Sequence, residues 1–220
     1  MQNTLHTLTG LVLLTVQTLP VLVMLLTLTI YVFFTHANGL VNKMNELKIA
    51  VEMYNAQIIC ISETHLNQGI KDCELKLDNF QIYRQDRTTG QKGGGSCIFV
   101  HKAINAEFIH DFHAPDSVGI NFQLNNNQFK FVSIYRSQNL EENAQKELIN
   151  NIEKLKTDTN EDIMVLGDFN LPDVNWNSMT VNCTTNTENS NLLLGSVMDS
   201  SLTKTLTGRL LTGCVTALTP

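Results

Sequence analysis

The chain has 220 residues, of which 16% are charged, and its formal net charge is −6. This length predicts one domain with a sizeable hydrophobic core. A protein held to DNA mainly through its phosphates carries a basic surface, so the acidic balance argues against tight nonspecific DNA binding. It does not argue against a site in which a metal cation supplies the positive charge.

Five cysteines are scattered along the chain without a Cys-x-x-Cys pair. Cys60 and Cys97 lie inside apolar, strand-like runs, which is typical of reduced core thiols in an intracellular protein. No cluster of cysteine and histidine has the spacing of zinc ligands.

The N-terminal segment is uncharged up to Lys43. Residues 11–34 are long enough to span a bilayer. However, residues 28–34 are rich in β-branched and aromatic side chains and predict the first strand of the domain. We therefore assign residues 1–27 to an apolar leader. Two alternatives stay open for this leader: a membrane segment, or translated sequence unrelated to the fold.

The pattern continues with an amphipathic helix over residues 40–56, because Leu40, Met44, Leu47 and Val51 recur at helical spacing. Strands are predicted at 57–62, 80–83 and 96–100. A loop with three consecutive glycines, residues 88–95, precedes the last of these strands.

The second half predicts a hairpin from residues 118–124 and 129–135, a second amphipathic helix over 140–155 and a strand at 162–166. Helices separate some strands and hairpins join others, so we expect mixed sheets covered by helices, an α/β or α+β fold. The domain is assigned to residues 28–204. The tail, residues 205–220, shows no clear element.

Carboxylates stand at two strand ends. Glu63 and Asp168 each follow a short apolar run. The first polar residues past a strand are often displayed at a catalytic rim. Two carboxylates, with Asn170 nearby, can hold a hard cation and orient a water beside a phosphate. The residues alone therefore favour phosphodiester hydrolysis.

Five blocks in order carry a family resemblance. They include Glu63-Thr64-His65-Leu66 and Gly167-Asp168-Phe169-Asn170, and together they cover residues 38–44, 58–66, 83–87 with 93–95, 135–136 and 167–176. Residues 28–204 resemble the endonuclease/exonuclease/phosphatase superfamily, and most of all the apurinic-type endonuclease domain of non-LTR retrotransposons. The resemblance implies a four-layer αββα sandwich that cleaves DNA with Mg²⁺ or Mn²⁺.

The resemblance also implies a role for each site residue. Glu63 would bind the metal, Asp168 would orient or deprotonate the attacking water, and Asn170 would hydrogen-bond the scissile phosphate. Tyr135 would help to position that phosphate. The alternatives are an ordinary strand-end carboxylate, an Asx-rich turn and a half-buried strand aromatic.

Three arginines are candidates for contacts with the DNA backbone: Arg84, Arg87 and Arg136. The alternative for the first two is a solvated, charged loop that also contains Asp86. No obligate protein partner is indicated. The expected location is intracellular, and nuclear if DNA is the substrate, with membrane association through residues 1–27 as the alternative.

The sequence departs from the family at two points. The family places an asparagine after the first strand, where this chain has His36, and it closes its site with Ser-Asp-His near the C-terminus. No histidine follows His113 here, and the only late aspartate is Asp199. We therefore expect strands of the second sheet to be missing and the activity to be impaired, since losing one member of a catalytic set costs orders of magnitude in rate.

Three alternatives stay open. The first is a catalytically inactive fragment of a retrotransposon polyprotein. The second is a membrane-anchored phosphatase of the same superfamily, and the third is a small membrane-anchored binding protein.

Overall fold

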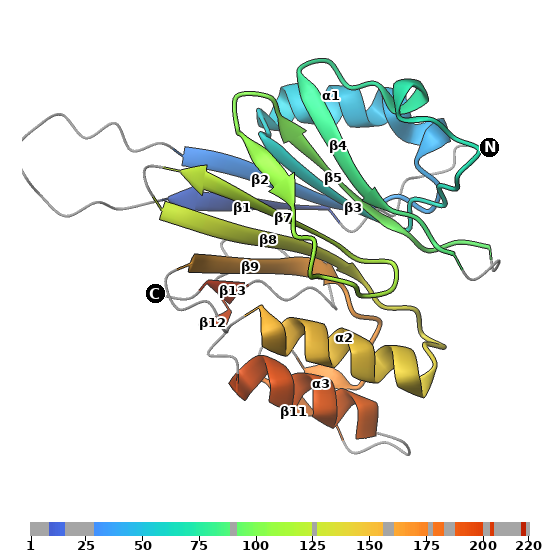
Figure 1. Ribbon diagram of the computed structural model, residues 1–220, viewed down its shortest axis with the longest axis vertical. Helices are drawn as coiled ribbons and strands as arrows, with labels where there is room; N and C mark the ends of the chain where they lie inside the picture. The colour runs from blue at the N-terminus through green and yellow to red at the C-terminus, as the bar shows by residue number, and fades with distance from the viewer. Residues whose placement is uncertain are drawn as a thin grey trace, which may run out of the picture.

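Two β-sheets lie face to face, and helices cover both outer faces, so that the molecule has four layers (Figure 1). The computed structural model describes residues 9–15, 29–88, 92–124, 127–155, 161–175, 178–182, 188–199, 203–204 and 217–218. Within them the expected αββα sandwich is confirmed.

The first sheet has the strand order β1-β2-β3-β5-β4. Its strands are β1 (Thr9–Thr15), β2 (Thr29–His36), β3 (Ile58–Ser62), β4 (Phe80–Gln85) and β5 (Ser96–His101). The pair β2 and β3 is parallel, and the other neighbours are antiparallel.

The second sheet has the order β6-β7-β8-β9. Its strands are β6 (Ala106–Phe108), β7 (Val118–Leu124), β8 (Asn127–Tyr135) and β9 (Glu161–Asp168). Here too one pair, β8 and β9, is parallel. Two short hairpins complete the described strands: β10 (Val174–Asn175) with β11 (Thr180–Val181), and β12 (Thr203–Lys204) with β13 (Ala217–Leu218).

A helix connects each parallel pair. The 3₁₀ turn η1 (Val41–Lys43) and helix α1 (Met44–Tyr54) join β2 to β3, and α2 (Glu142–Lys154) joins β8 to β9. A further 3₁₀ turn, η2 (Asp72–Leu75), precedes β4, and α3 (Glu188–Asp199) packs beside α2. Because parallel strands connected in this way point the same way, each sheet brings two strand ends to one edge.

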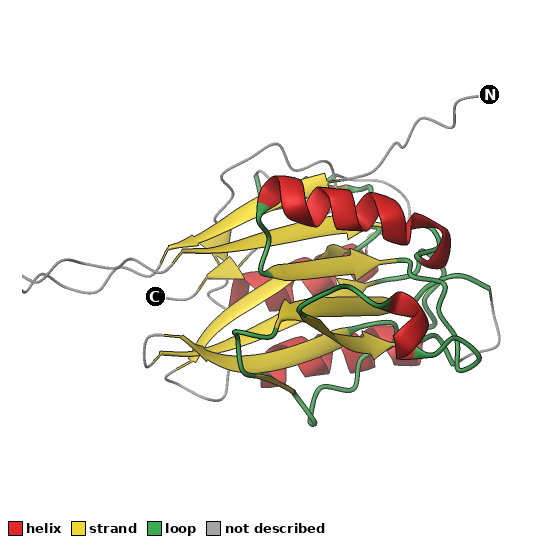
Figure 2. Cartoon of the chain, turned by 90° about the horizontal axis from the view of Figure 1, so that it is seen from above, coloured by secondary structure: helices red, strands yellow, loops and turns green. Residues whose placement is uncertain are grey.

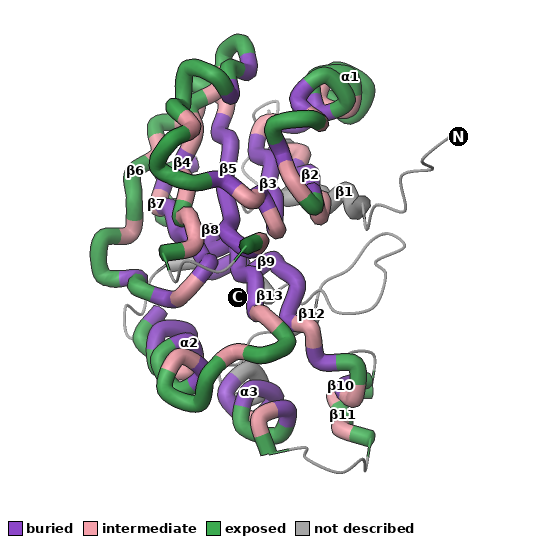
Figure 3. The backbone as a smooth tube through the Cα atoms, turned by 90° about the vertical axis from the view of Figure 1, so that its right-hand side faces the viewer, coloured by how far each residue is buried: buried purple, intermediate pink, exposed green. Residues whose placement is uncertain are grey.

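The main core lies between the sheets (Figure 3). Side chains alternate along β3: Ile58 and Cys60 face this core, whereas Ile59 and Ile61 face the helix layer. Every residue of β3 is buried. Burial on both faces explains why the strand is a continuous apolar run rather than an alternating one.

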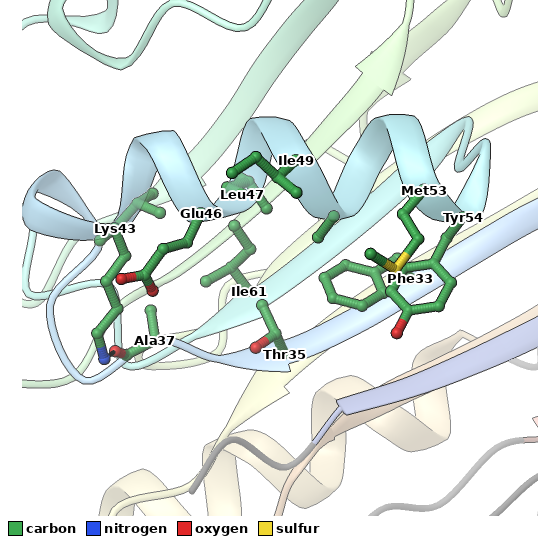
Figure 4. A pocket seen from close by; sticks show the side chains of 12 residues that line it. Phe33, Thr35, Ala37, Lys43, Glu46, Leu47, Ile49, Met53, Tyr54 and Ile61 are labelled. Atoms are coloured by element: carbon green, nitrogen blue, oxygen red, sulfur yellow. Dashed lines mark hydrogen bonds between the residues drawn. The ribbon is translucent and has the colours of Figure 1, made fainter. Parts of the chain in front are cut away.

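Helix α1 lies along the strands of the first sheet, as Figure 2 shows from above. Its Tyr54 ring stacks on Phe33 of β2, with ring centroids 5.3 Å apart. A groove of about 290 Å³ opens between the helix and β2, and Ile49 and Met53 stand at its exposed rim (Figure 4). Helices α2 and α3 cover the second sheet through Leu148, Ile152 and Leu193, among others.

The expected helices and strands are present, with ends shifted by a few residues. Two strands lie in segments that were placed outside the domain, and β6, β10, β11, β12 and α3 are additional elements that the pattern did not predict. Residues 9–15, inside the segment assigned to a leader, form β1 and extend the first sheet beyond β2. Residues 217–218, inside the unassigned tail, form β13, which lies against β9. Most of the segments 1–27 and 205–220 lies outside the described residues.

The structure offers no membrane-spanning helix within its described residues. None of the helices there is both long enough and apolar enough to cross a bilayer.

Candidate active site

Four candidate residues meet at the carboxyl edge of the two parallel strand pairs. His36 is the last residue of β2, and Glu63 directly follows β3. Tyr135 and Asp168 are the last residues of β8 and β9, and they face each other in the strand register. Each sheet therefore contributes two strand ends, and the four side chains come within reach of one another.

Glu63 is the centre of this cluster. The Tyr135 hydroxyl donates a hydrogen bond to its Oε1. His36 Nε2 lies 3.0 Å from its Oε2, and His65 Nε2 lies 3.5 Å from the same oxygen. Burial alone would raise the pKa of Glu63, but the bond from Tyr135 and the charges of both imidazoles outweigh it, so the pKa is lowered.

His36 joins the two carboxylates. Its Nδ1 lies 3.4 Å from Asp168 Oδ2 and 3.3 Å from the Ser62 hydroxyl, while its Nε2 faces Glu63. The hydrogen bond with Asp168 is the largest influence on its pKa. That bond and the charge of Glu63 together outweigh burial and raise the pKa of His36. The site therefore favours the imidazolium form, which neutralises part of the negative charge of the two carboxylates.

The segment after β3 is held from both sides. The amide of Gly39 donates to the Glu63 carbonyl at 2.9 Å, and the amide of His65 donates to the Gly94 carbonyl at 3.0 Å. Glu63 and His65 both have positive φ, 50° and 54°. Side chains other than glycine rarely adopt this conformation, so these backbone bonds must hold it.

The glycine triplet makes this support possible. Gly94 has φ +73°, and a Cβ atom there would lie 2.3 Å from the guanidinium of Arg87. Gly95 has φ +78°, and its Cβ atom would lie 2.8 Å from the Thr64 hydroxyl. Only glycine combines positive φ with so close an approach, which accounts for the Gly93-Gly94-Gly95 motif.

The segment after β9 forms a tight loop. The amide of Asn170 donates to Asp168 Oδ1 at 3.0 Å, and its side-chain Nδ2 donates to the Arg136 carbonyl at 2.8 Å. Asn170 has φ 47°, a conformation that asparagine tolerates better than most residues. Gly167 lets the two strands approach closely, because a Cβ atom there would lie 2.0 Å from the Ile134 carbonyl.

Tyr135 connects the site to the glycine loop. Burial, then the bond to Glu63, raises the pKa of Tyr135, so the phenol stays protonated and acts as a donor. The guanidinium of Arg87 lies over its ring, 5.9 Å from the centroid. Arg87 is held in turn by Asp116, with Nε 2.8 Å from Oδ2.

The three arginines predicted to contact DNA are all engaged inside the protein. Arg84 binds Asp86 Oδ2 at 3.0 Å and the Ile70 carbonyl at 2.9 Å. Arg87 is paired with Asp116. Arg136 is only 4% exposed. In this arrangement their side chains are engaged within the protein around the site, so a solvated loop does not describe Arg84 or Arg87, and contact with DNA stays a prediction.

Sequence reasoning missed the roles of two residues. His65 stands in the motif quoted above, but its contact with Glu63 depends on the positive φ of both residues. Asp116 is buried, and besides Arg87 it accepts the Gly95 amide at 3.1 Å. Its partners lie 21 and 29 positions away, so local sequence gave no signal for it. Trp176 of the predicted motif lies outside the described residues.

The donor set fits a sparsely ligated Mg²⁺ or Mn²⁺ ion. Such ions accept one or two carboxylates and complete their shell with water and substrate phosphate. Glu63 would hold the ion, with Asp168 on the other side of His36. Within the described part of the chain, no group of three or more His, Cys, Asp or Glu side chains is arranged to hold a metal ion.

Comparison with known sequences gives one family match. Residues 129–212, which include Tyr135, Asp168 and Asn170, match the family described as Endonuclease-reverse transcriptase. Among curated proteins no sequence match is found.

Three solved structures illustrate the similarity of fold, each at 13% sequence identity. The AP endonuclease LMAP from Leishmania major has a TM-score of 0.61, with 78% of this chain and 66% of that chain covered. This chain thus spans slightly less than two thirds of the Leishmania protein. The endonuclease domain of TRAS1, a telomere-specific non-LTR retrotransposon, has a TM-score of 0.60, with 84% and 82% covered. The 3′ phosphatase NExo from Neisseria has a TM-score of 0.52, with 78% and 72% covered.

Proposed function

We propose that the chain is a member of the endonuclease/exonuclease/phosphatase superfamily that hydrolyses phosphodiester bonds of DNA, as a retrotransposon-type endonuclease domain that depends on a divalent cation. One observation carries the proposal. Glu63 and Asp168, from strand ends of two different sheets, lie on opposite sides of one imidazole in a single cluster. Carboxylates brought together in this way suit attack of water on a phosphate.

Each residue then has a defined task. Asp168, fixed through the Asn170 amide, accepts a proton from the attacking water. Asn170 uses one side-chain N–H on the Arg136 carbonyl, and an amide has a second N–H, which would bind a non-bridging phosphate oxygen. Tyr135 holds Glu63 in place and limits its rotation. Glu63 would hold the divalent cation, and the cation would neutralise charge at the scissile phosphate.

His36 stands where the family has an asparagine. As an imidazolium it donates to carboxylates on both sides, and it would also attract the phosphate. Its charge would partly replace that of a cation, which is a weaker arrangement because an imidazolium cannot polarise a phosphoryl oxygen as a Lewis acid does. We therefore expect slow cleavage.

A second candidate is a catalytically inactive member of the superfamily. The same contact favours it, because His36 occupies an oxygen of Glu63 that a metal ion would use. In that case the chain would bind DNA or cation weakly and cut nothing.

Nicking of supercoiled plasmid by the full chain separates the two candidates. The assay is run with Mg²⁺, with Mn²⁺ and with EDTA, alongside Glu63→Ala and Asp168→Ala. The proposed function requires metal-dependent nicking that both variants lose. A folded wild-type chain that never nicks under any metal supports the inactive candidate.

A further inference from the structure

Arg136 contacts the Asp168–Asn170 loop through both its main chain and its side chain. It directly follows β8 and is 4% exposed. Its backbone amide donates to the Asp168 carbonyl at 2.8 Å, and its own carbonyl accepts from Asn170 Nδ2 at 2.8 Å. Arg136 thus contacts the loop through its main chain at both ends.

The side chain of Arg136 contacts the same loop. Its Nη1 faces the carbonyls of Phe169 and Asn170 at 3.3 and 3.4 Å, and its Nε donates to Gln145 Oε1 at 2.6 Å. Gln145 lies on α2 and is 1% exposed. One guanidinium therefore ties the catalytic loop to the helix layer beneath it.

A buried cation has a cost that must be offset. Transfer of a guanidinium from water to the interior is unfavourable unless several acceptors surround it, and burial lowers the pKa of Arg136. Here the acceptors include backbone carbonyls of the loop and one glutamine, and the charge of Asp173 also favours the cation. The planar fork of arginine reaches them in several directions at once, which the ammonium of lysine cannot do.

The loop needs this support because of its conformation. Asn170 has φ 47°, and its peptide amide is turned toward Asp168 Oδ1. Without the contacts from the Arg136 guanidinium, this conformation would be one of several that the loop can adopt. The position of the Asp168 carboxylate, which the Asn170 amide fixes, would then spread as well.

We propose that Arg136 is a positioning residue: its buried guanidinium clamps the carbonyls of Phe169 and Asn170 and so presets Asp168 and Asn170 for attack on the phosphate. This assignment replaces the predicted contact between Arg136 and DNA. The catalytic part of the proposal rests on the proposed function, whereas the clamp itself does not.

The clamp is tested by amide hydrogen exchange of Asn170 in the ¹⁵N-labelled full chain, with Arg136→Lys and Gln145→Met. Gln145→Met removes the oxygen that accepts the hydrogen bond from Arg136 Nε. Methionine is a good helix former of similar length, so this variant keeps the fold even where Arg136→Lys does not. Ile152→Val, a buried change on the same helix, serves as the stability control. We expect exchange of the Asn170 amide to be about tenfold faster in both test variants and unchanged in the control. Unchanged protection in a folded test variant overturns the proposal.

The catalytic part is tested by the rate of nicking. We expect Arg136→Lys to lower kcat about 100-fold with little change in KM, as for a displaced catalytic group. Added guanidinium ions should partly restore the nicking rate of Arg136→Ala, and added ammonium ions should not. A raised KM with unchanged kcat would mean a DNA contact and overturns the proposal. A wild-type chain that does not nick refutes the proposed function, and the exchange measurement still decides the clamp.

Discussion

The imidazole Nε2 of His36 lies 3.0 Å from Oε2 of Glu63. In the proposed site, His36 would therefore compete with a divalent cation for the Glu63 carboxylate. Asparagine is neutral and shorter, so it would leave Oε2 available.

We predict that His36→Asn binds Mn²⁺ about tenfold more tightly than the wild type, because one charge-assisted hydrogen bond to Glu63 is lost. Titration calorimetry or water proton relaxation at neutral pH measures this affinity. His110→Asn, at an exposed histidine on a loop, is the matched control. Equal or weaker Mn²⁺ binding by His36→Asn would show that the imidazole does not compete.

We predict that the imidazole of His36 keeps its proton to a higher pH than an ordinary histidine. Its pKa is raised above the ordinary 6.5, chiefly by Asp168. The stability that this pairing contributes is therefore complete below pH 6.5 and is lost as the pH rises through the higher folded pKa. An NMR titration of the imidazole should place its midpoint above 6.5, and Asp168→Asn should shift it down. A wild-type midpoint at or below 6.5 would contradict the pairing.

Removal of the Tyr135 hydroxyl should act on Glu63. Tyr135→Phe deletes the donor to Oε1, which helps to lower the pKa of Glu63. We expect that pKa to rise and the free energy of unfolding to fall by about 0.5–1.5 kcal/mol, the usual net contribution of one hydrogen bond, since this bond is only partly buried. A carbon-detected titration of the Glu63 carboxyl checks the first effect and urea denaturation the second. An unchanged pKa of Glu63 in Tyr135→Phe would mean that the hydrogen bond from Tyr135 does not form in solution.

Substituting alanine at two glycines should change the stability of the protein in opposite directions. Gly94→Ala places a Cβ atom against the Arg87 guanidinium at φ +73° and should destabilise by about 1–3 kcal/mol. Gly195→Ala lies in α3 with nothing within 4 Å of the new Cβ atom and should stabilise by about 0.5–1 kcal/mol. Urea denaturation compares the two. Equal effects would contradict the role given to the glycine triplet.

The fold and the strand-end carboxylates could be predicted because both depend on local pattern. Apolar runs mark β3 and β9, and the first polar residue after each, or at its end, reaches the rim. Glu63 and Asp168 were therefore located from the residues alone, whereas Tyr135 came from the family resemblance, and the structure brings all three together with His36.

The surroundings of the site could not be predicted, because they depend on partners distant in the chain. Asp116 is paired with Arg87 across 29 positions, and Arg136 is oriented by Gln145 on a helix. The sequence pattern around an arginine near the site does not show whether its guanidinium group faces solvent or the interior. The edge strand β1 was missed for a related reason, since an apolar segment without charge fits a sheet edge and a membrane segment equally well.

Glu63 and Asp168 are proposed to act together in one hydrolytic site. A double-mutant cycle of plasmid nicking with Glu63→Gln, Asp168→Asn and the double variant tests this proposal most directly. We predict metal-dependent nicking by the wild type, losses of about 100-fold or more in each single variant, and little further loss in the double variant, because residues of one site are not additive. Losses that multiply, or a rate that neither change affects, would contradict the account.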